Sequence, residues 1–245
     1  MPLKAVIFDF IGTLVNCRDY NMVDSEAKLY SALISEGFDI EKDRFLVSYK
    51  ETHQKYRKVR YEQFREVTNA VWVSEALCNL GFKVTPENRQ VKTALNVFFQ
   101  DFLDTLELRR GAKQLLNQIS QQYRVGLISN FTHAPVIHKG LRKIGIHNCF
   151  NAVVISQDVK WRKPSPRIFC DTLIRLGVQA HEAVFIGDSP TEDIGGAKEA
   201  GLKTVFIPSQ FNSLDDLAQS KQAPDGIVER LESIPQKLRQ IFVAV

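Results

Sequence analysis

The sequence predicts an α/β protein in which a doubly wound parallel sheet is interrupted by a helical insert. Three observations predict this class. Short apolar runs, rich in β-branched residues, alternate with helical patterns in the second half of the chain. A further run of this kind, residues 3–8, stands near the N-terminus. Between them lies a long stretch with helical periodicity alone. Strands that are apolar on both faces are typical of parallel sheets covered by helices on both sides.

The expected elements follow from these patterns in chain order. From residue 23 to residue 106 apolar side chains recur at helical spacing, and we find no convincing strand there. Beyond Gly111, helices and strands alternate. The sequence therefore divides into a parallel α/β core, residues 1–16 and 108–245, and a helical cap, residues 17–107. The expected helices of the core are 112–121, 136–144, 166–176 and 193–200, and its later strands are 124–129, 152–156, 183–186 and 204–207.

The composition limits the classes of partner. With 245 residues and 44% hydrophobic content, the chain can bury a large core. The net charge of +4 suits an anionic small-molecule substrate, and no basic tail calls for nucleic acid. No apolar run approaches the length that spans a membrane, and the N-terminal run is too short for a signal peptide. Four widely spaced cysteines indicate reduced thiols. We expect a cytoplasmic protein, as a monomer or a homodimer.

Polar side chains follow the expected strands at the points where they end. Asp9 ends the first strand, Ser129 and Asn130 end the next, Lys163 lies in the loop after the third, and Asp188 follows the fourth. Because ligands of open parallel sheets bind at the carboxyl ends of the strands, we expect these groups to converge. Carboxylates there can hold Mg²⁺, and a lysine offsets their charge. Such a site can perform phosphoryl transfer by positioning and charge stabilisation.

These residues also carry a resemblance to a known family. Asp9-Phe10-Ile11-Gly12-Thr13 resembles D-x-D-G-T, the first motif of the haloacid dehalogenase superfamily. Ser129-Asn130 is similar to its second motif, Lys163-Pro164-Ser165-Pro166 to its third, and residues 187–193 to its fourth. The four motifs occur in the family's order, and the match runs from residue 3 to about residue 207. The helical segment is similar to the cap of subfamily I, which is inserted after the first strand of a Rossmann-like core.

The resemblance implies a role for each matching residue. Asp9 would be the nucleophile that forms a covalent ester with the substrate. Mg²⁺ would be bound by Asp9, Asp188 and the backbone carbonyl of Ile11. Thr13, Ser129 and Asn130 would contact the substrate. Ser129 would also act in catalysis, together with Lys163. Asp193 would support Lys163 or the metal.

One position departs from the family's first motif. Ile11 replaces the second aspartate, which in the family's phosphatases protonates the leaving oxygen and then activates water. Isoleucine can do neither, and the loss of a positioned acid–base group typically lowers a rate about 10²–10⁴-fold. The favoured interpretation is a Mg²⁺-dependent phosphatase of small phosphorylated metabolites, with weakened acid–base catalysis.

Ile11 leaves two alternative functions open. In 2-haloacid dehalogenases a bulky non-acidic residue occupies this position, but their fourth motif lacks the Gly187-Asp188 pair found here. Phosphonoacetaldehyde hydrolases carry a small residue there and use a cap lysine, so a phosphonatase-like reaction belongs to the same alternative. The other alternative is a catalytically poor protein that binds a ligand or a partner.

Overall fold

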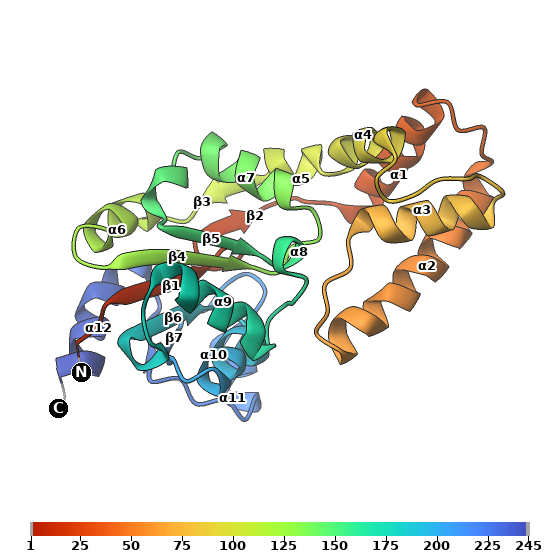
Figure 1. Cartoon of the computed structure of the whole chain (residues 1–245). Helices are drawn as coiled ribbons and strands as arrows, with labels where there is room; N and C mark the ends of the chain where they lie inside the picture. The colour runs from red at the N-terminus through yellow and green to blue at the C-terminus, as the bar shows by residue number, and fades with distance from the viewer. Residues whose placement is uncertain (1, 244–245) are drawn as a thin grey trace.

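A six-stranded parallel sheet forms the centre of the structure, a computed structural model that describes residues 2–243 (Figure 1). The strands lie in the order β5-β4-β1-β6-β7-β8, and each neighbouring pair is parallel. The chain starts in the middle of the sheet and then builds it outward in both directions, which confirms the doubly wound class. The strands are β1 Ala5–Asp9, β4 Arg124–Ser129, β5 Ala152–Ile155, β6 Ala183–Gly187, β7 Lys203–Phe206 and β8 Gly226–Ile227.

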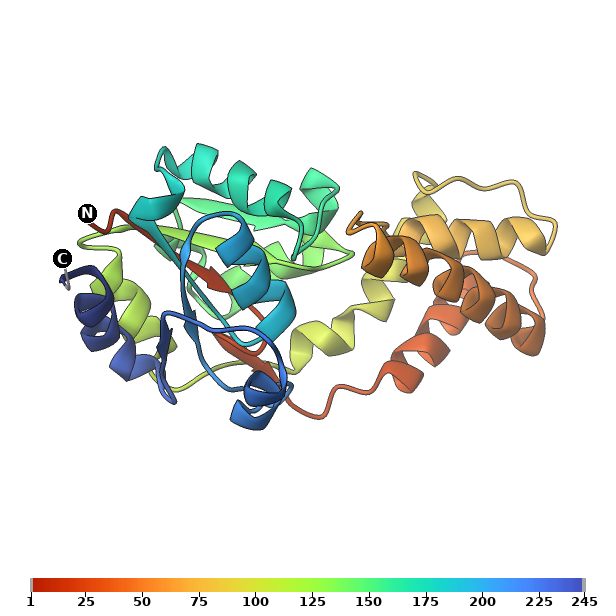
Figure 2. The same cartoon turned by 90° about the horizontal axis from the view of Figure 1, so that it is seen from below.

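Helices cover both faces of this sheet (Figures 1 and 2). Successive residues of β1 alternate between the two apolar clusters, because side chains of a strand point to opposite faces in turn. Val6 and Phe8 pack with one set of helices, and Ala5 and Ile7 pack with the other. The first set is α6 Ala112–Ile119, α7 Ala134–Lys143 and α12 Ile234–Val243, and the second is α9 Pro166–Leu176 and α10 Gly196–Glu199. Two short helices, α8 Ser156–Val159 and α11 Leu214–Gln219, lie in loops.

Five helices form an insert between β1 and β4, which we call the helical insert. Figure 2 shows most of it standing to one side of the sheet, beyond the strand ends. Within it α1 packs against α4 and α2 packs against α3. The last and shortest helix, α5, packs against α7 of the core. The five helices are α1 Met22–Ser35, α2 Lys42–Glu62, α3 Asn69–Asn79, α4 Arg89–Phe98 and α5 Gln100–Asp104.

A short antiparallel ribbon connects the insert to the core. It consists of β2 Val15–Cys17 and β3 Leu106–Leu108, with Cys17 opposite Leu106. The expected cap boundaries, 16/17 and 107/108, both fall inside this ribbon. Strands of three residues are too short to show a period of two, so the sequence pattern did not reveal them. The division of the chain into cap and core at these points stays a prediction.

Three elements in the C-terminal half differ from the expected ones. The helix predicted at 193–200 begins earlier, as a π-helical turn, η3 Pro190–Gly195, that continues into α10. The side chain of Ser189 accepts a hydrogen bond from the backbone N–H of Glu192 and so starts this turn. The edge strand β8 and the helix α12 were not predicted. Among residues 2–243 no helix combines the length and the hydropathy needed to cross a membrane.

Candidate active site

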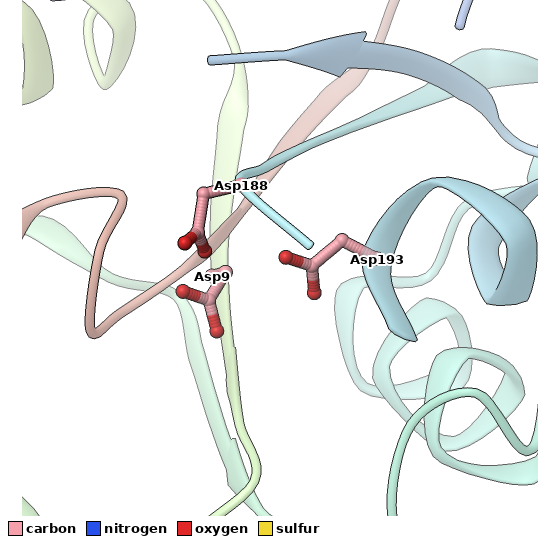
Figure 3. A group of neighbouring side chains, drawn as sticks. All are labelled: Asp9, Asp188 and Asp193. Carbon is pink, nitrogen blue, oxygen red and sulfur yellow. The ribbon is translucent and has the colours of Figure 1, made fainter. Parts of the chain in front are cut away.

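Three buried aspartates gather at the carboxyl ends of the central strands. Asp9 is the last residue of β1, Asp188 directly follows β6, and Asp193 lies in η3 (Figure 3). One carboxylate oxygen of each lies within 4.8 Å of the others. The strand order reverses between β1 and β6, and doubly wound sheets bind ligands at the carboxyl ends of the strands at such a point.

Lys163 joins two of these carboxylates. Its Nζ donates to Asp9 Oδ1 and to Asp193 Oδ1, both at 2.6 Å, and the residue is 2% exposed. Burial by itself lowers the pKa of Lys163, but Asp193 and Asp9 outweigh it and the net pKa is raised. The ammonium therefore stays charged. Counted as formal charges with every carboxylate ionised, one ammonium against three carboxylates gives this cluster a net charge of −2.

Two oxygen atoms of the first motif have no hydrogen-bond partner among the described residues. They are Asp9 Oδ2 and Thr13 Oγ1, and both are buried. Burial raises the pKa of Asp9 well above its ordinary value; Lys163 opposes this shift, and Asp193 and Asp188 add to it. A buried polar atom without a partner is costly, so these two unpaired atoms are candidates for binding a ligand.

Asp188 is oriented by two residues that the sequence analysis missed. Its Oδ2 accepts a hydrogen bond from Ser209 Oγ at 2.5 Å and from Asn212 Nδ2 at 3.1 Å. The loop that carries Gly12 approaches the same carboxylate closely. A Cβ atom on Gly12 would lie 2.5 Å from Asp188 Oδ2, and Gly12 has φ +94°, so this position requires glycine. Ser209 follows the end of β7, and the strand-end rule applied to that strand would have found it.

Asn130 fixes the backbone of Lys163. Its Oδ1 accepts from Lys163 N at 2.8 Å and its Nδ2 donates to Lys163 O at 3.0 Å. The same Nδ2 lies 2.9 Å from Glu192 Oε2, and Glu192 Oε1 accepts from Arg162 at 3.0 Å. The structure thus places Asn130 beside Lys163. The predicted contact of Asn130 with substrate stays a prediction.

The other predicted residues also lie at this edge of the sheet. Ser129 is the buried last residue of β4. Thr13 follows Asp9 in the first motif and is fully buried. Asp193 contacts Lys163, and its Oδ2 accepts from the backbone N–H of Ser189 at 2.9 Å. The structure brings the predicted residues together, while their catalytic, binding and metal-ligating roles, including that of the Ile11 carbonyl, stay predictions.

A cavity of about 260 Å³ lies between the helical insert and the core. The core contributes Ile11, Asn130 and Phe131 to its wall, and the insert contributes mainly aromatic side chains together with Arg60 and Asn69. Ile11 therefore presents an apolar side chain to the cavity. The volume lies near the lower end of the range for small-molecule sites, which favours a small metabolite.

The loop between α2 and α3 contacts the core directly before Lys163. Glu66 N donates to Lys160 O and Arg162 N donates to Phe64 O, both at 3.0 Å. The Glu66 side chain is fully buried and accepts from Ser156 Oγ at 2.5 Å. The segment that carries the lysine is thus held from both sides, by Asn130 of the core and by the loop of the insert.

Comparison with known proteins agrees with this architecture. A glyceraldehyde 3-phosphate phosphatase of Methanothermobacter thermautotrophicus is 30% identical over 215 residues, which cover 87% of this chain and 89% of that protein. A ribulose-1,5-bisphosphate 5-phosphatase of Halopiger xanaduensis is 26% identical over 230 residues, 91% of this chain and 94% of that one. A solved structure of a 2-haloacid dehalogenase from Pseudomonas syringae superposes with a TM-score of 0.71 at 21% identity, covering 97% and 99% of the two chains, and supports the fold.

The family itself is shown by a match over most of the chain. Residues 3–201 match the sequence profile of the haloacid dehalogenase-like hydrolases. This range includes the carboxylates Asp9, Asp188 and Asp193 and the ammonium of Lys163. The chain belongs to the haloacid dehalogenase-like hydrolase family.

Proposed function

We propose that this protein is a Mg²⁺-dependent phosphatase that hydrolyses small phosphate monoesters through an aspartyl phosphate on Asp9. The observation that carries the proposal is the state of the Asp9 carboxylate. One of its oxygens is held by Lys163, and the other, Oδ2, is buried without a partner at the edge of a site with a formal net charge of −2. The substrates named for the relatives, glyceraldehyde 3-phosphate and ribulose 1,5-bisphosphate, favour a small phosphorylated metabolite.

The residues present fit a magnesium ion. All side-chain donors of the cluster are carboxylate oxygens, which Mg²⁺ prefers, and its two charges would balance the two excess negative charges. Asp9 Oδ2, Asp188 and the backbone carbonyl of Ile11 would hold the ion, and Asp193 would remain on Lys163. When bound, Mg²⁺ supplies charge stabilisation at a phosphoryl oxygen.

The residues of the chain account for the bond changes. An oxygen of Asp9 attacks phosphorus, the bond from phosphorus to the leaving oxygen breaks, and its electron pair stays on that oxygen. The Lys163 ammonium, held by Asp193, offsets the charge of the phosphoryl group on Asp9. Ile11 has no proton to give, so the leaving oxygen takes one from water. A second water then attacks phosphorus and gives a proton to the hydroxide that the first water became. The bond between phosphorus and the Asp9 oxygen breaks, which releases phosphate and restores the Asp9 carboxylate.

The apolar side chain of Ile11 favours one second candidate, the hydrolysis of a carbon–halogen bond, because halide leaves without a proton. The excess negative charge of the carboxylate cluster argues against dehalogenation. That charge favours a bound metal ion, and the dehalogenase reaction needs none. A phosphonatase-like reaction would need a lysine of the insert at the substrate. No lysine of the insert lines the cavity among the described residues, and Lys28 and Lys55 instead form surface ion pairs with Asp101 and Glu75.

A panel of phosphate esters and 2-haloacids, with phosphate and halide readouts, tests this proposal. Each substrate is assayed with Mg²⁺ and with chelator, for the natural protein, for Asp9→Asn and for Asp39→Asn, an exposed control. We expect phosphate release that disappears with chelator and in Asp9→Asn, while the control retains it. Metal-independent halide release would establish the dehalogenase reaction instead. Absence of all turnover, with ligand binding unchanged in Asp9→Asn, would establish a binding protein.

A further inference from the structure

The wall that the helical insert contributes to the cavity carries a single arginine, Arg60 of α2, among mostly aromatic side chains. Its guanidinium lies 5.7 Å from the ring centroid of Trp72 and 12% of its side chain is exposed. Aromatic packing keeps such a guanidinium in one plane and leaves its edge available for hydrogen bonds. Arg60 is therefore a largely buried cation that faces a small-molecule cavity.

Glu66 fixes the orientation of Arg60. Arg60 Nε donates to Glu66 Oε1 at 2.7 Å, and the other oxygen of Glu66 accepts from Ser156 of the core. This uses one of the five N–H groups of the guanidinium. Among the described residues, the two terminal nitrogens of Arg60 have no hydrogen-bond partner. The four remaining N–H groups form a planar fork, which is the arrangement that binds carboxylate and phosphate groups.

Asn69 is a second polar residue on the same wall. It is the first residue of α3, it is 4% exposed, and its Oδ1 has no hydrogen-bond partner among residues 2–243. Buried amides are normally paired, so an unpaired one beside a cavity indicates a group that completes its bonds with a ligand. Because no protein bond holds this amide, it can turn its Nδ2 donor toward the cavity.

We propose that Arg60 and Asn69 bind a second anionic group of the substrate, at the end opposite to the phosphate that Asp9 attacks. The inference rests on the proposed function and narrows its substrate class to phosphate monoesters that carry a further carboxylate or phosphate. Arg60 supplies charge-assisted hydrogen bonds to that group, Asn69 adds one amide donor, and Glu66 acts as a positioning residue for Arg60. The aromatic side chains enclose the carbon skeleton between the two ends.

Three esters with one skeleton distinguish the possible anions. Glycerol 3-phosphate has no second anion, 3-phosphoglycerate has a carboxylate, and glycerol 1,3-bisphosphate has a second phosphate. In the natural protein we expect kcat/KM for at least one of the two acidic esters to exceed that for glycerol 3-phosphate by about tenfold or more, which is the effect of a charged hydrogen bond. The preferred acidic ester identifies the anion.

Substitution of Arg60 tests whether it produces this preference. Arg60→Met keeps the length of the side chain and should reduce the ratio of kcat/KM between the acidic and neutral esters to about one, mainly through a higher KM. Arg60→Lys should retain part of the preference. Arg57→Met removes an exposed arginine of the same helix and should leave the ratio unchanged. Because both esters are assayed on one preparation, a misfolded fraction cancels from the ratio.

Loss of Arg60 removes the nearer of two arginines beside the buried Glu66 carboxylate, since Arg162 lies 3.9 Å from its other oxygen. Arg60→Met combined with Glu66→Gln therefore provides a variant without that buried charge. It should also show no preference. A ratio unchanged in both variants, or no preference in the natural protein, overturns the anion site while the proposed phosphatase stands. Absence of phosphate release from all three esters and from p-nitrophenyl phosphate overturns the proposed function, and this inference with it.

Discussion

Ile11 occupies the wall of the cavity two residues after the proposed nucleophile. An acid at this position could protonate a leaving oxygen, whereas an isoleucine leaves the expelled group to depend on its own acidity. The rate of the first step should therefore fall steeply as the leaving group becomes more basic. An aryl phosphate, whose leaving group is weakly basic, should be a much better substrate than an alkyl phosphate of similar size.

The variant Ile11→Asp tests this dependence. It should raise phosphate release from an alkyl ester about 10²-fold or more, which is the contribution of a positioned acid–base group. Release from p-nitrophenyl phosphate should rise far less, because that leaving group needs no proton. The measurement is kcat for both esters, with Ile11→Asn as a control of similar size that cannot supply the proton. Equal gains for the two esters in Ile11→Asp would contradict the proposed role of this position.

The strand-end rule predicted much of the candidate site from single residues. Asp9, Asp188 and Lys163 were identified because each follows an apolar run, and the structure places them within one cluster. The rule also applies to Ser209, which follows the apolar run 204–207, but its hydrogen bond to Asp188 depends on how the following loop folds. Arg60 was visible only as one of several basic residues on a helix, and its link to Glu66 depends on how α2 and the following loop fold together.

At the scale of elements, the first turn of α7 provides a contact between core and insert. His133, which precedes this helix, stacks on Phe99 with 4.6 Å between ring centroids, and its Nε2 lies 3.3 Å from Asn96 Oδ1. Burial, together with the charge of Lys139, lowers the pKa of His133 to about 4. The ring is therefore neutral at neutral pH, and its protonation opposes this packing.

This shift predicts a loss of stability in mild acid. The unfolded chain binds a proton at His133 near pH 6.5, but the folded protein does so only near pH 4. Between these values the unfolded state binds more protons, so stability falls as the pH falls through this window. We expect the natural protein to lose about 1–2 kcal/mol more than His133→Phe between pH 6.5 and 4.5, measured by urea unfolding. Equal losses in the two proteins would show that His133 titrates normally.

The long elements of the core were predictable, and the short ones were not. The expected strand at 124–129 and the expected helix at 166–176 agree with β4 and α9 residue for residue, because apolar runs and helical spacing are clear over such lengths. The strands β2 and β3 of the ribbon contain three residues each, and β8 contains two. Elements of that length are fixed by the neighbours they pair with, and a single sequence does not contain those neighbours' positions.

For the molecule as a whole, the negative charge of the carboxylate cluster lowers the stability of the folded state, and a bound cation would offset that charge. At a Mg²⁺ concentration 100-fold above its dissociation constant, binding should stabilise the folded state by about 2.7 kcal/mol. For a chain of this size that corresponds to a rise in Tm of about 5–10 °C. Calorimetry with and without Mg²⁺ measures this rise, independently of activity.

Asp188→Asn should remove most of this rise, and Asp39→Asn should not. Without Mg²⁺ the Asp188→Asn protein should be at least as stable as the natural one, because it has one fewer carboxylate in the cluster. An undiminished Mg²⁺ effect in Asp188→Asn would place the bound ion elsewhere in the molecule.

The ribbon of β2 and β3 has a consequence for how such a protein can acquire a new substrate. The chain leaves the core at Cys17 and returns beside it at Leu106, so the two ends of the insert are already joined by hydrogen bonds. The entropy of closing a loop grows only by about 0.6 kcal/mol for each doubling of its length. Segments of different length and sequence can therefore be exchanged at this junction with little disturbance to the sheet. The proposed nucleophile, Asp9, would stay in place, and the insert, which we propose contributes to substrate selection, would be replaceable.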